Sequence, residues 1–292
     1  MQSIEERINE GDHYGALQTL KTLLVRASKK KDMERVGEIG RKGSILLLRN
    51  GHATAGLDVS LNLVEIWESS KQSVTEETKV IVQDINDAYM TGIKDKAEGA
   101  RLNGKFLDAA IEWSKEENQK SNSYKRGDPL FHHLAAKAKL RAGDPGGACQ
   151  HFVHAHQPKE FAALLFQWSN QGYQNERDMF LARAIFQLLA QENLKDANIV
   201  FDTFCALLLT KSIKLEAPLF NFVRFLLKTL ERDAYPLFKV LRDKYAPVLR
   251  SDPSFDSFLD QIQVAFFNVK PQKKGMAAMM ENMLGMFGAP PQ

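Results

Sequence analysis

Apolar residues recur along almost the whole chain at the three-to-four-residue spacing of an amphipathic helix. Leu17, Leu20 and Leu24 fall on one helical face, and Phe180 and Ala184 begin the same pattern far downstream. No segment of the sequence sustains the alternation of apolar and polar residues that a half-buried strand requires. The pattern therefore predicts an all-α protein.

Glycine and proline divide the periodic segments, because glycine permits the turn that ends a helix and proline is tolerated in a first helical turn. Pro129, Pro145, Pro158 and Pro218 each stand at or near the start of a periodic segment. The helices expected from these signals are 2–10, 13–28, 32–49, 55–69, 74–91, 93–102, 106–119, 129–141, 145–156, 158–171, 176–190, 194–209, 217–230, 233–245, 254–267 and 276–286.

A short signature, Gly-x-x-x-x-Ala, recurs at 11–16, 104–109 and 143–148, and a copy without its glycine stands at 192–197. The glycine is expected to end one helix, and the small alanine lets the next helix approach closely. The copies are unevenly spaced, as in a degenerate repeat. We expect a tetratricopeptide-like α-solenoid, in which stacked antiparallel helix pairs bury one another's apolar faces.

Composition fits an ordered, soluble chain, since 44% of its 292 residues are hydrophobic and 26% are charged. No apolar run reaches the roughly 18–20 residues that a membrane-spanning helix requires. The first residues lack the pattern of a secretory signal. Two cysteines, Cys149 and Cys205, are too few for a disulfide framework. We therefore expect a cytosolic protein that does not insert into membranes.

The net charge of +3 is mild, but the segment from 21 to 49 is strongly basic. No aromatic residues interleave its central charges, so stacking on nucleic-acid bases is not supported and an acidic protein partner fits better. Asp58 and Glu65 lie two helical turns apart on one face, either as solvated charge or as contacts to a partner. The basic residues of the segment are Lys21, Arg26, Lys29, Lys30, Lys31, Arg35, Arg41, Lys42 and Arg49.

Candidate chemical sites are few. Cys149, His151, His154 and His156 are potential metal ligands, but on a helix only His151 and His154 share a face, so we expect no metal site and one buried histidine. The sequence contains no phosphate-binding glycine loop and no hydrolase or zinc-protease motif. We therefore expect no enzyme activity, no catalytic residue and no cofactor.

Two apolar features near the C-terminus leave alternatives open. The aromatic residues of this region belong to the core or line a groove for a partner helix. The methionine-rich segment 271–292 either caps the solenoid or captures exposed hydrophobic client segments. The aromatic residues concerned are Phe220, Phe222, Phe225, Phe266 and Phe267.

Five motifs follow one another along the chain: GDHYGALQTLKTLLVRA (11–27), RGDPLFHH (126–133), DMFLARAIFQLLA (178–190), PLFNFVRFLL (218–227) and DPSFDSFLDQIQVAFFNVKPQ (252–272). In this order they resemble the Golgi-to-ER traffic protein four family, the adaptor of the pathway that guides tail-anchored proteins to the ER. The resemblance extends over nearly the whole chain, from Gly11 to Gly288, and we expect a fungal-type member.

The resemblance implies a non-enzymatic bridge. Residues 1–125 would dock on the pathway's homodimeric targeting ATPase and restrain ATP hydrolysis until the client is loaded. Residues 126–270 would bind a ubiquitin-like-domain protein, an obligate partner whose dimerisation gives a heterotetramer and which recruits a co-chaperone. Segment 271–292 is expected to be partly disordered. No nucleic-acid partner is implied, and the alternative function is a chaperone that binds hydrophobic clients directly through the methionine-rich C-terminus.

The family's functional positions fall on residues of this chain that the charge and aromatic patterns already single out. Its basic docking positions fall on Arg7 and Lys29, and its acidic regulatory positions fall on Asp58 and Glu65. Arg26 and Lys30 belong to the same basic patch and join the expected ATPase-binding set. The expected surface for the ubiquitin-like partner is Phe220, Phe222, Phe225, Phe266 and Phe267.

This sequence departs from the family pattern in two places. Its N-terminus is short against the family pattern, so we expect part of the first helix and any basic docking residue there to be missing or truncated. The link 210–217 is also short, where some members insert a β-hairpin that helps to hold the ubiquitin-like partner. The expected hairpin is therefore in doubt, whereas the aromatic groove is retained.

Overall fold

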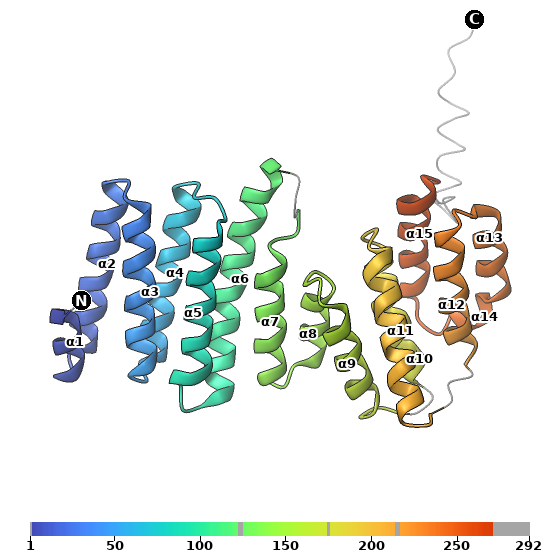
Figure 1. Ribbon diagram of the computed structural model, residues 1–292, viewed down its shortest axis with the longest axis horizontal. Coiled ribbons are helices and arrows are strands. Elements are labelled where there is room, and N and C mark those ends of the chain that lie inside the picture. The colour runs from blue at the N-terminus through green and yellow to red at the C-terminus, as the bar shows by residue number, and fades with distance from the viewer. Residues whose placement is uncertain (1, 122–124, 174–175, 214–216, 271–292) are drawn as a thin grey trace, which may run out of the picture. The chain divides into compact units, whose positions relative to one another are not determined.

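The computed structural model shows only helices as regular structure in the residues that it describes, which confirms the all-α expectation (Figure 1). The chain divides into two compact units, Met1–Leu164 and Leu165–Gln292. The predicted functional division at 125/126 differs from this boundary and stays a prediction. The described residues are 2–121, 125–173, 176–213 and 217–270, with side chains described for all of these except 2 and 116–121.

Consecutive helices run antiparallel in the first unit, and several also contact the helix two further along, as expected for stacked helix pairs (Figure 1). This arrangement confirms the predicted solenoid of antiparallel pairs. The helices of this unit are α1 (Gln2–Asn9), α2 (His13–Lys29), α3 (Met33–Arg49), α4 (Ala53–Ser69), α5 (Glu76–Gly92), α6 (Lys96–Ser121), α7 (Pro129–Arg141) and α8 (Pro145–Phe152).

The second unit is organised around α10, which contacts α11, α12 and α15. Helix α9 (Pro158–Ser169) contains the boundary between the units. Phe186 of α10 makes edge-to-face contacts with Phe222 and Phe255, and such pairs fill a core with defined geometry. The helices of the second unit are α10 (Arg177–Leu189), α11 (Leu194–Thr210), α12 (Pro218–Glu231), α13 (Tyr235–Lys244), α14 (Ala246–Leu249) and α15 (Ser254–Phe267).

Helices α2, α3 and α4 form a regular repeat that the sequence signature does not reveal. Each has 17 residues, and they begin 20 residues apart, at 13, 33 and 53. One residue in each preceding turn is left-handed: Gly11, Lys31 and Gly51. The next N–H closes the turn on a carbonyl of the helix before it, as from His52 to Leu47 at 2.9 Å. Helix length and turn closure thus define the repeat, whatever residue occupies the turn.

The Gly-x-x-x-x-Ala signature predicts helix ends correctly at two of its three glycines. Gly11 and Gly143 are left-handed and end helices, as predicted, and Glu192 adopts the same conformation in the copy that lacks glycine. Gly104, however, lies inside α6, so the predicted helices 93–102 and 106–119 are wrong and form one helix. A glycine costs a helix interior only about 1 kcal/mol, which packing readily offsets. The expected helix 276–286 lies outside the described residues.

Helix α3 is the packing centre of the first unit because small residues lie on the faces that its neighbours contact. Gly43 lies against Leu20 of α2, and Gly40 lies against Leu63 of α4. A Cβ atom at either position would meet a leucine methyl below 3 Å. Glycine therefore lets the helices approach α3 more closely than any larger residue would allow.

Buried polar contacts fix how α4, α5, α6 and α7 pack. The indole N–H of Trp113 donates to the carbonyl of Gln72 at 3.0 Å, and the ring lies beside that of Trp67. Asp128, almost fully buried, caps α7 and forms an ion pair with Lys79 of α5 at 3.3 Å. Because buried polar groups cost free energy unless they are paired, these contacts favour one arrangement of the helices.

We expect Gly92→Ala to destabilise the protein, because a Cβ on this last residue of α5 would lie 2.7 Å from the backbone carbonyl oxygen of Leu48. Backbone cannot rotate away as a side chain does, so the loss in unfolding free energy should be about 1–3 kcal/mol by urea titration. Gly104→Ala is the matched control. No atom lies within 4 Å of its added Cβ, so this helix-interior change should stabilise slightly. Equal stability of the two variants would contradict the packing account.

Candidate docking surfaces

A shallow groove of about 360 Å³ lies along the first helices, and two of the predicted ATPase-binding residues line it. Arg7 comes from α1, and Arg26 comes from the last turns of α2. The groove between them is lined by uncharged side chains, and both arginines are exposed. Its remaining lining residues are Gly15, Gln18, Thr19, Thr22 and Leu23.

Lys29 and Lys30 extend this basic surface beyond the groove. Lys29 is the last residue of α2, Lys30 is its C-cap, and both are exposed. In the ranges that the structure describes, Arg26, Lys29 and Lys30 form no ion pair, whereas Arg7 contacts Asp12 at 3.4 Å. The structure therefore places these four predicted residues at one end of the first unit with most of their charge available to a partner.

Other basic residues of the predicted patch are neutralised by neighbouring helices. Lys21 pairs with Asp58 of α4 at 3.2 Å, and Arg41 pairs with Asp84 of α5 at 2.5 Å. Lys42 pairs with Glu38 within α3. The accessible basic surface therefore contains fewer residues than the number of Lys and Arg side chains in segment 21–49 suggests. Ion pairs with other helices cannot be recognised from the sequence of that segment alone.

The predicted acidic residues lie on α4, and one of them faces α2. The Asp58 carboxylate is about half exposed and contacts Lys21. Glu65 is exposed and accepts a hydrogen bond from Asn62 Nδ2 at 3.4 Å. The structure thus connects Asp58 directly to the helix that carries Arg26 and Lys29. The sequence places Lys21 in the basic segment but gives no sign that it pairs with Asp58.

The five predicted aromatic residues do not form one exposed surface. Phe222 is 1% exposed and packs against Phe186 and Tyr245, whereas Phe220 stacks on Phe201. Phe225, by contrast, is 44% exposed on α12.

The other two aromatic residues, Phe266 and Phe267, are partly buried on α15. Phe267 contacts the rings of Tyr235 and Phe238. Of the five, Phe225 is the residue most accessible to a partner, and the docking role of the set stays a prediction. The link 210–217 includes residues outside the described ranges, and the methionine-rich segment 271–292 lies outside them entirely.

A histidine cluster joins α7 to α8. The Nδ1 atoms of His132 and His151 are 3.1 Å apart, and His132 Nε2 lies 2.9 Å from the carbonyl of Arg126. The ring of His154 lies 4.8 Å from that of His132. Burial lowers the pKa of His132 to about 4 and that of His154 to about 3. Of the histidines in the expected set, His151 and His154 are half-buried between the helices and His156 is exposed. The buried histidine is His132, which lies outside that set because it comes from another helix.

Metal and thiol chemistry find no support in this region. Among the residues that the structure describes, no three His, Cys, Asp or Glu side chains are arranged to hold a metal ion. Burial raises the pKa of the Cys149 thiol to about 12, so it is protonated and unreactive at neutral pH.

Among the residues that the structure describes, no helix is both long and apolar enough to cross a bilayer.

The fold and its exposed charged surfaces define a helical-hairpin scaffold, a class of protein that works by binding other proteins. The chain matches the family model Golgi to ER traffic protein 4 over residues 30–287. It belongs to the Golgi to ER traffic protein 4 family. Members of this family are non-enzymatic adaptors in the targeting of tail-anchored proteins, and that role extends to this chain.

Relatives occur in distant eukaryotes. A Golgi to ER traffic protein 4 homolog of Dictyostelium discoideum is 34% identical over 288 residues, covering 98% of this chain and 88% of that protein. Protein GET4 of Arabidopsis thaliana is 29% identical and covers 96% and 93%. The human homolog is 28% identical and covers 95% and 82%. These relatives do not distinguish a fungal-type member, which stays a prediction.

A solved structure supports the fold over the full length. The crystal structure of C. therm. Get4 superposes with a TM-score of 0.82, covering 99% of this chain and 95% of that chain. Sequence identity between the two is 22%, so the agreement concerns the fold.

The histidine cluster predicts a pH dependence of stability. Because the folded-state pKa of His132 lies below its unfolded value near 6.5, the stabilisation is complete above pH 6.5 and is lost as pH falls toward 4. The loss should reach about 3 kcal/mol at most. His132→Leu should flatten the dependence of unfolding free energy on pH between 7 and 5. His156→Asn, a change at an exposed histidine beyond the end of α8, should keep the native slope. Identical slopes for His132→Leu and the native protein would contradict the assignment.

Proposed function

We propose that this chain is a cytosolic adaptor that bridges the homodimeric targeting ATPase of the tail-anchored pathway and a ubiquitin-like-domain protein. The first unit would dock on the ATPase and restrain ATP hydrolysis before client loading. The second partner would be obligate, would form a heterotetramer through its own dimerisation and would recruit a co-chaperone. Nucleic-acid binding and membrane insertion form no part of the proposal.

The observation that carries the ATPase proposal is the accessible charge at the end of α2. Arg26, Lys29 and Lys30 are exposed and lack ion pairs among the described residues, and Arg26 shares its groove with Arg7. Exposed cations without partners attract an acidic surface at long range and set the orientation of docking. These exposed cations therefore support an acidic surface of the ATPase as the partner that binds the end of α2.

The Lys21–Asp58 ion pair supports a regulatory role for the acidic face. An ATPase that docks on α2 would come close to Asp58, because this carboxylate contacts that helix. The pair is partly exposed, so its contribution to stability is small and a partner can rearrange it. Asp58 would therefore act through contact with the ATPase, together with Glu65 on the same helix.

The surface for the ubiquitin-like partner is proposed on the second unit. Phe225 of α12 and Leu209 of α11 are the exposed large apolar residues of two helices that contact each other. Exposed aromatic and aliphatic side chains are typical anchors of protein interfaces. Direct client binding by segment 271–292 remains the alternative, and no described residue favours it.

Reversing charge at Arg26 and Lys29 together should weaken ATPase binding by about tenfold or more, because like charges would then face the acidic partner. The affinity should be measured by titration at two salt concentrations, since the native interaction should weaken more steeply with salt. Lys94→Glu, at an exposed position between α5 and α6, is the matched control and should bind as the native chain does. Unchanged affinity of the double variant would contradict the docking surface.

Asp58→Lys should raise ATP turnover in the complex by about fivefold, the weak end of allosteric coupling. Docking on the ATPase should be largely retained. Turnover should be measured with the ATPase saturated by adaptor. Lys21→Met breaks the same ion pair but keeps the carboxylate, so it should leave turnover close to the native value. Equal turnover with Asp58→Lys and the native chain would remove Asp58 from the regulatory role.

A further inference from the structure

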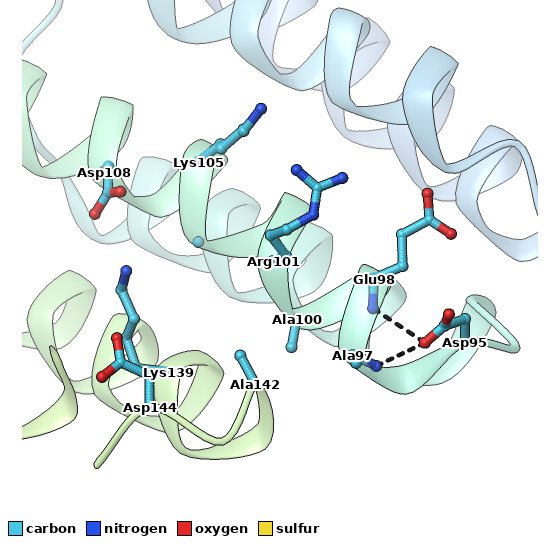
Figure 2. A pocket seen from close by; sticks show the side chains of 11 residues that line it. Asp95, Ala97, Glu98, Ala100, Arg101, Lys105, Asp108, Lys139, Ala142 and Asp144 are labelled. Carbon is cyan, nitrogen blue, oxygen red and sulfur yellow. Dashed lines mark hydrogen bonds between the residues drawn. The ribbon is translucent and has the colours of Figure 1, made fainter. Parts of the chain in front are cut away.

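A groove of about 730 Å³ lies between α6 and the junction of α7 with α8 in the first unit (Figure 2). Four carboxylates and three cations line it, so its charge favours neither an anionic nor a cationic ligand. Arg101 and Lys105 point away from Lys139, which lies on the other side of the groove (Figure 2). The groove therefore does not select a ligand, in contrast to an apolar surface on α13 of the second unit.

An apolar stripe on α13 is left uncovered by the residues that the structure describes. Leu237 is 47% exposed and Val240 is 59% exposed, and Pro236 beside them is also exposed. These three positions share one side of the helix because of its 3.6-residue period, whereas Phe238 and Leu241 are buried. Neighbouring apolar side chains that remain exposed are typical of a surface that another segment of protein covers.

The chain leaves the second unit beside this helix. Phe267, the last residue of α15, contacts the ring of Tyr235 in the first turn of α13. Gln263 Nε2 donates to the carbonyl of Val269 at 3.1 Å, which holds the residues after α15 against that helix. Segment 271–292 therefore begins next to the first turn of α13.

The first residues of this segment are long enough to reach the stripe. Tyr235 and Val240 point to different sides of α13, since five residues turn a helix by more than one full turn. A helix with its side chains is about 10–12 Å across. Residues 271–275, if extended, span about 16–18 Å. The chain can therefore pass around α13 before the methionines begin.

The sequence beyond this link has the apolar pattern that such a stripe can bind. In a helix, residues 276–287 would place six large apolar side chains on one face over about 18 Å. Helix α13, with 10 residues, is about 15 Å long, so the two lengths match. Methionine also adapts to an irregular surface. The six residues are Met276, Met279, Met280, Met283, Leu284 and Phe287.

The stripe is too small to hold a separate protein. A stable interface between two proteins buries about 800 Å² on each partner. Three apolar side chains on a helix of 10 residues supply only a part of that area. A segment of the same chain binds at a high effective concentration, so a small contact is sufficient. The occupant that fits the stripe best is therefore a neighbouring part of this chain.

We propose that residues 276–287 form a helix that docks on the apolar stripe of α13 and covers it. The segment would leave α15, pass around the first turn of α13 and lie along that helix. Its methionines would then face α13 and would not be free to capture hydrophobic clients. The segment is thus a cap of the second unit. This cap does not depend on the proposed adaptor function, because no partner takes part in it.

Oxidation by dilute hydrogen peroxide tests the docking on the full chain, because a covered methionine reacts more slowly than an exposed one. The methionines of 276–287 should oxidise about fivefold more slowly than in a synthetic peptide 271–292, as expected for a segment docked about 80% of the time. Mass spectrometry measures both rates. Val240→Asp should raise the rate in the chain to that of the peptide, since a carboxylate resists burial under the helix.

Val25→Asp, the same change at an exposed valine of α2, is the matched control and should keep the protection. Residue 240 is exposed in the described chain, so its change leaves the core intact. Equal oxidation rates in the native chain and the peptide would overturn the proposal, as would full protection in Val240→Asp.

A photo-crosslinker identifies the surface that the segment contacts. Val240→p-benzoylphenylalanine should crosslink to 276–287 of the same molecule, with a yield that is unchanged on about tenfold dilution. The same label at Asp202, an exposed position of α11, should not reach the segment. Crosslinks between two chains that disappear on dilution would overturn the proposal in favour of a second copy. The absence of any crosslink to 276–287 would also overturn it.

Discussion

The first unit depends on how closely its helices approach α3. Gly40 and Gly43 allow Leu63 of α4 and Leu20 of α2 to reach the α3 backbone, and any larger residue would push these helices apart. The same approach brings α2 beside α4, where Lys21 meets Asp58. The charged contact at the proposed ATPase surface is thus a consequence of close packing in the core.

Much of the fold could be predicted from the sequence because helical periodicity is local. The all-α class and the antiparallel pairs follow from patterns within single segments. The single helix α6 could not be predicted, since Gly104 has the local signature of a helix end and only tertiary packing overrides it. The Gly-x-x-x-x-Ala signature does not show the repeat of α2, α3 and α4, because Lys31 takes the place of its glycine in one turn and Gly56 takes the place of its alanine after another.

The sites were less predictable because they depend on contacts between helices. The sequence placed Arg26 and Lys29 in a basic patch but could not show that Lys21 and Arg41 are paired with other helices. It grouped Phe222 with Phe225, although one is in the core and the other is exposed.

The equal length of α2, α3 and α4 bears on how such a protein changes over evolutionary time. Each helix together with its turn is a unit of constant size, and the turn closes through backbone hydrogen bonds that do not require a particular side chain. Duplication of a gene segment that encodes one hairpin therefore lengthens the array without disturbing the helices on either side. Growth of this kind lengthens the array by a fixed increment for each added hairpin.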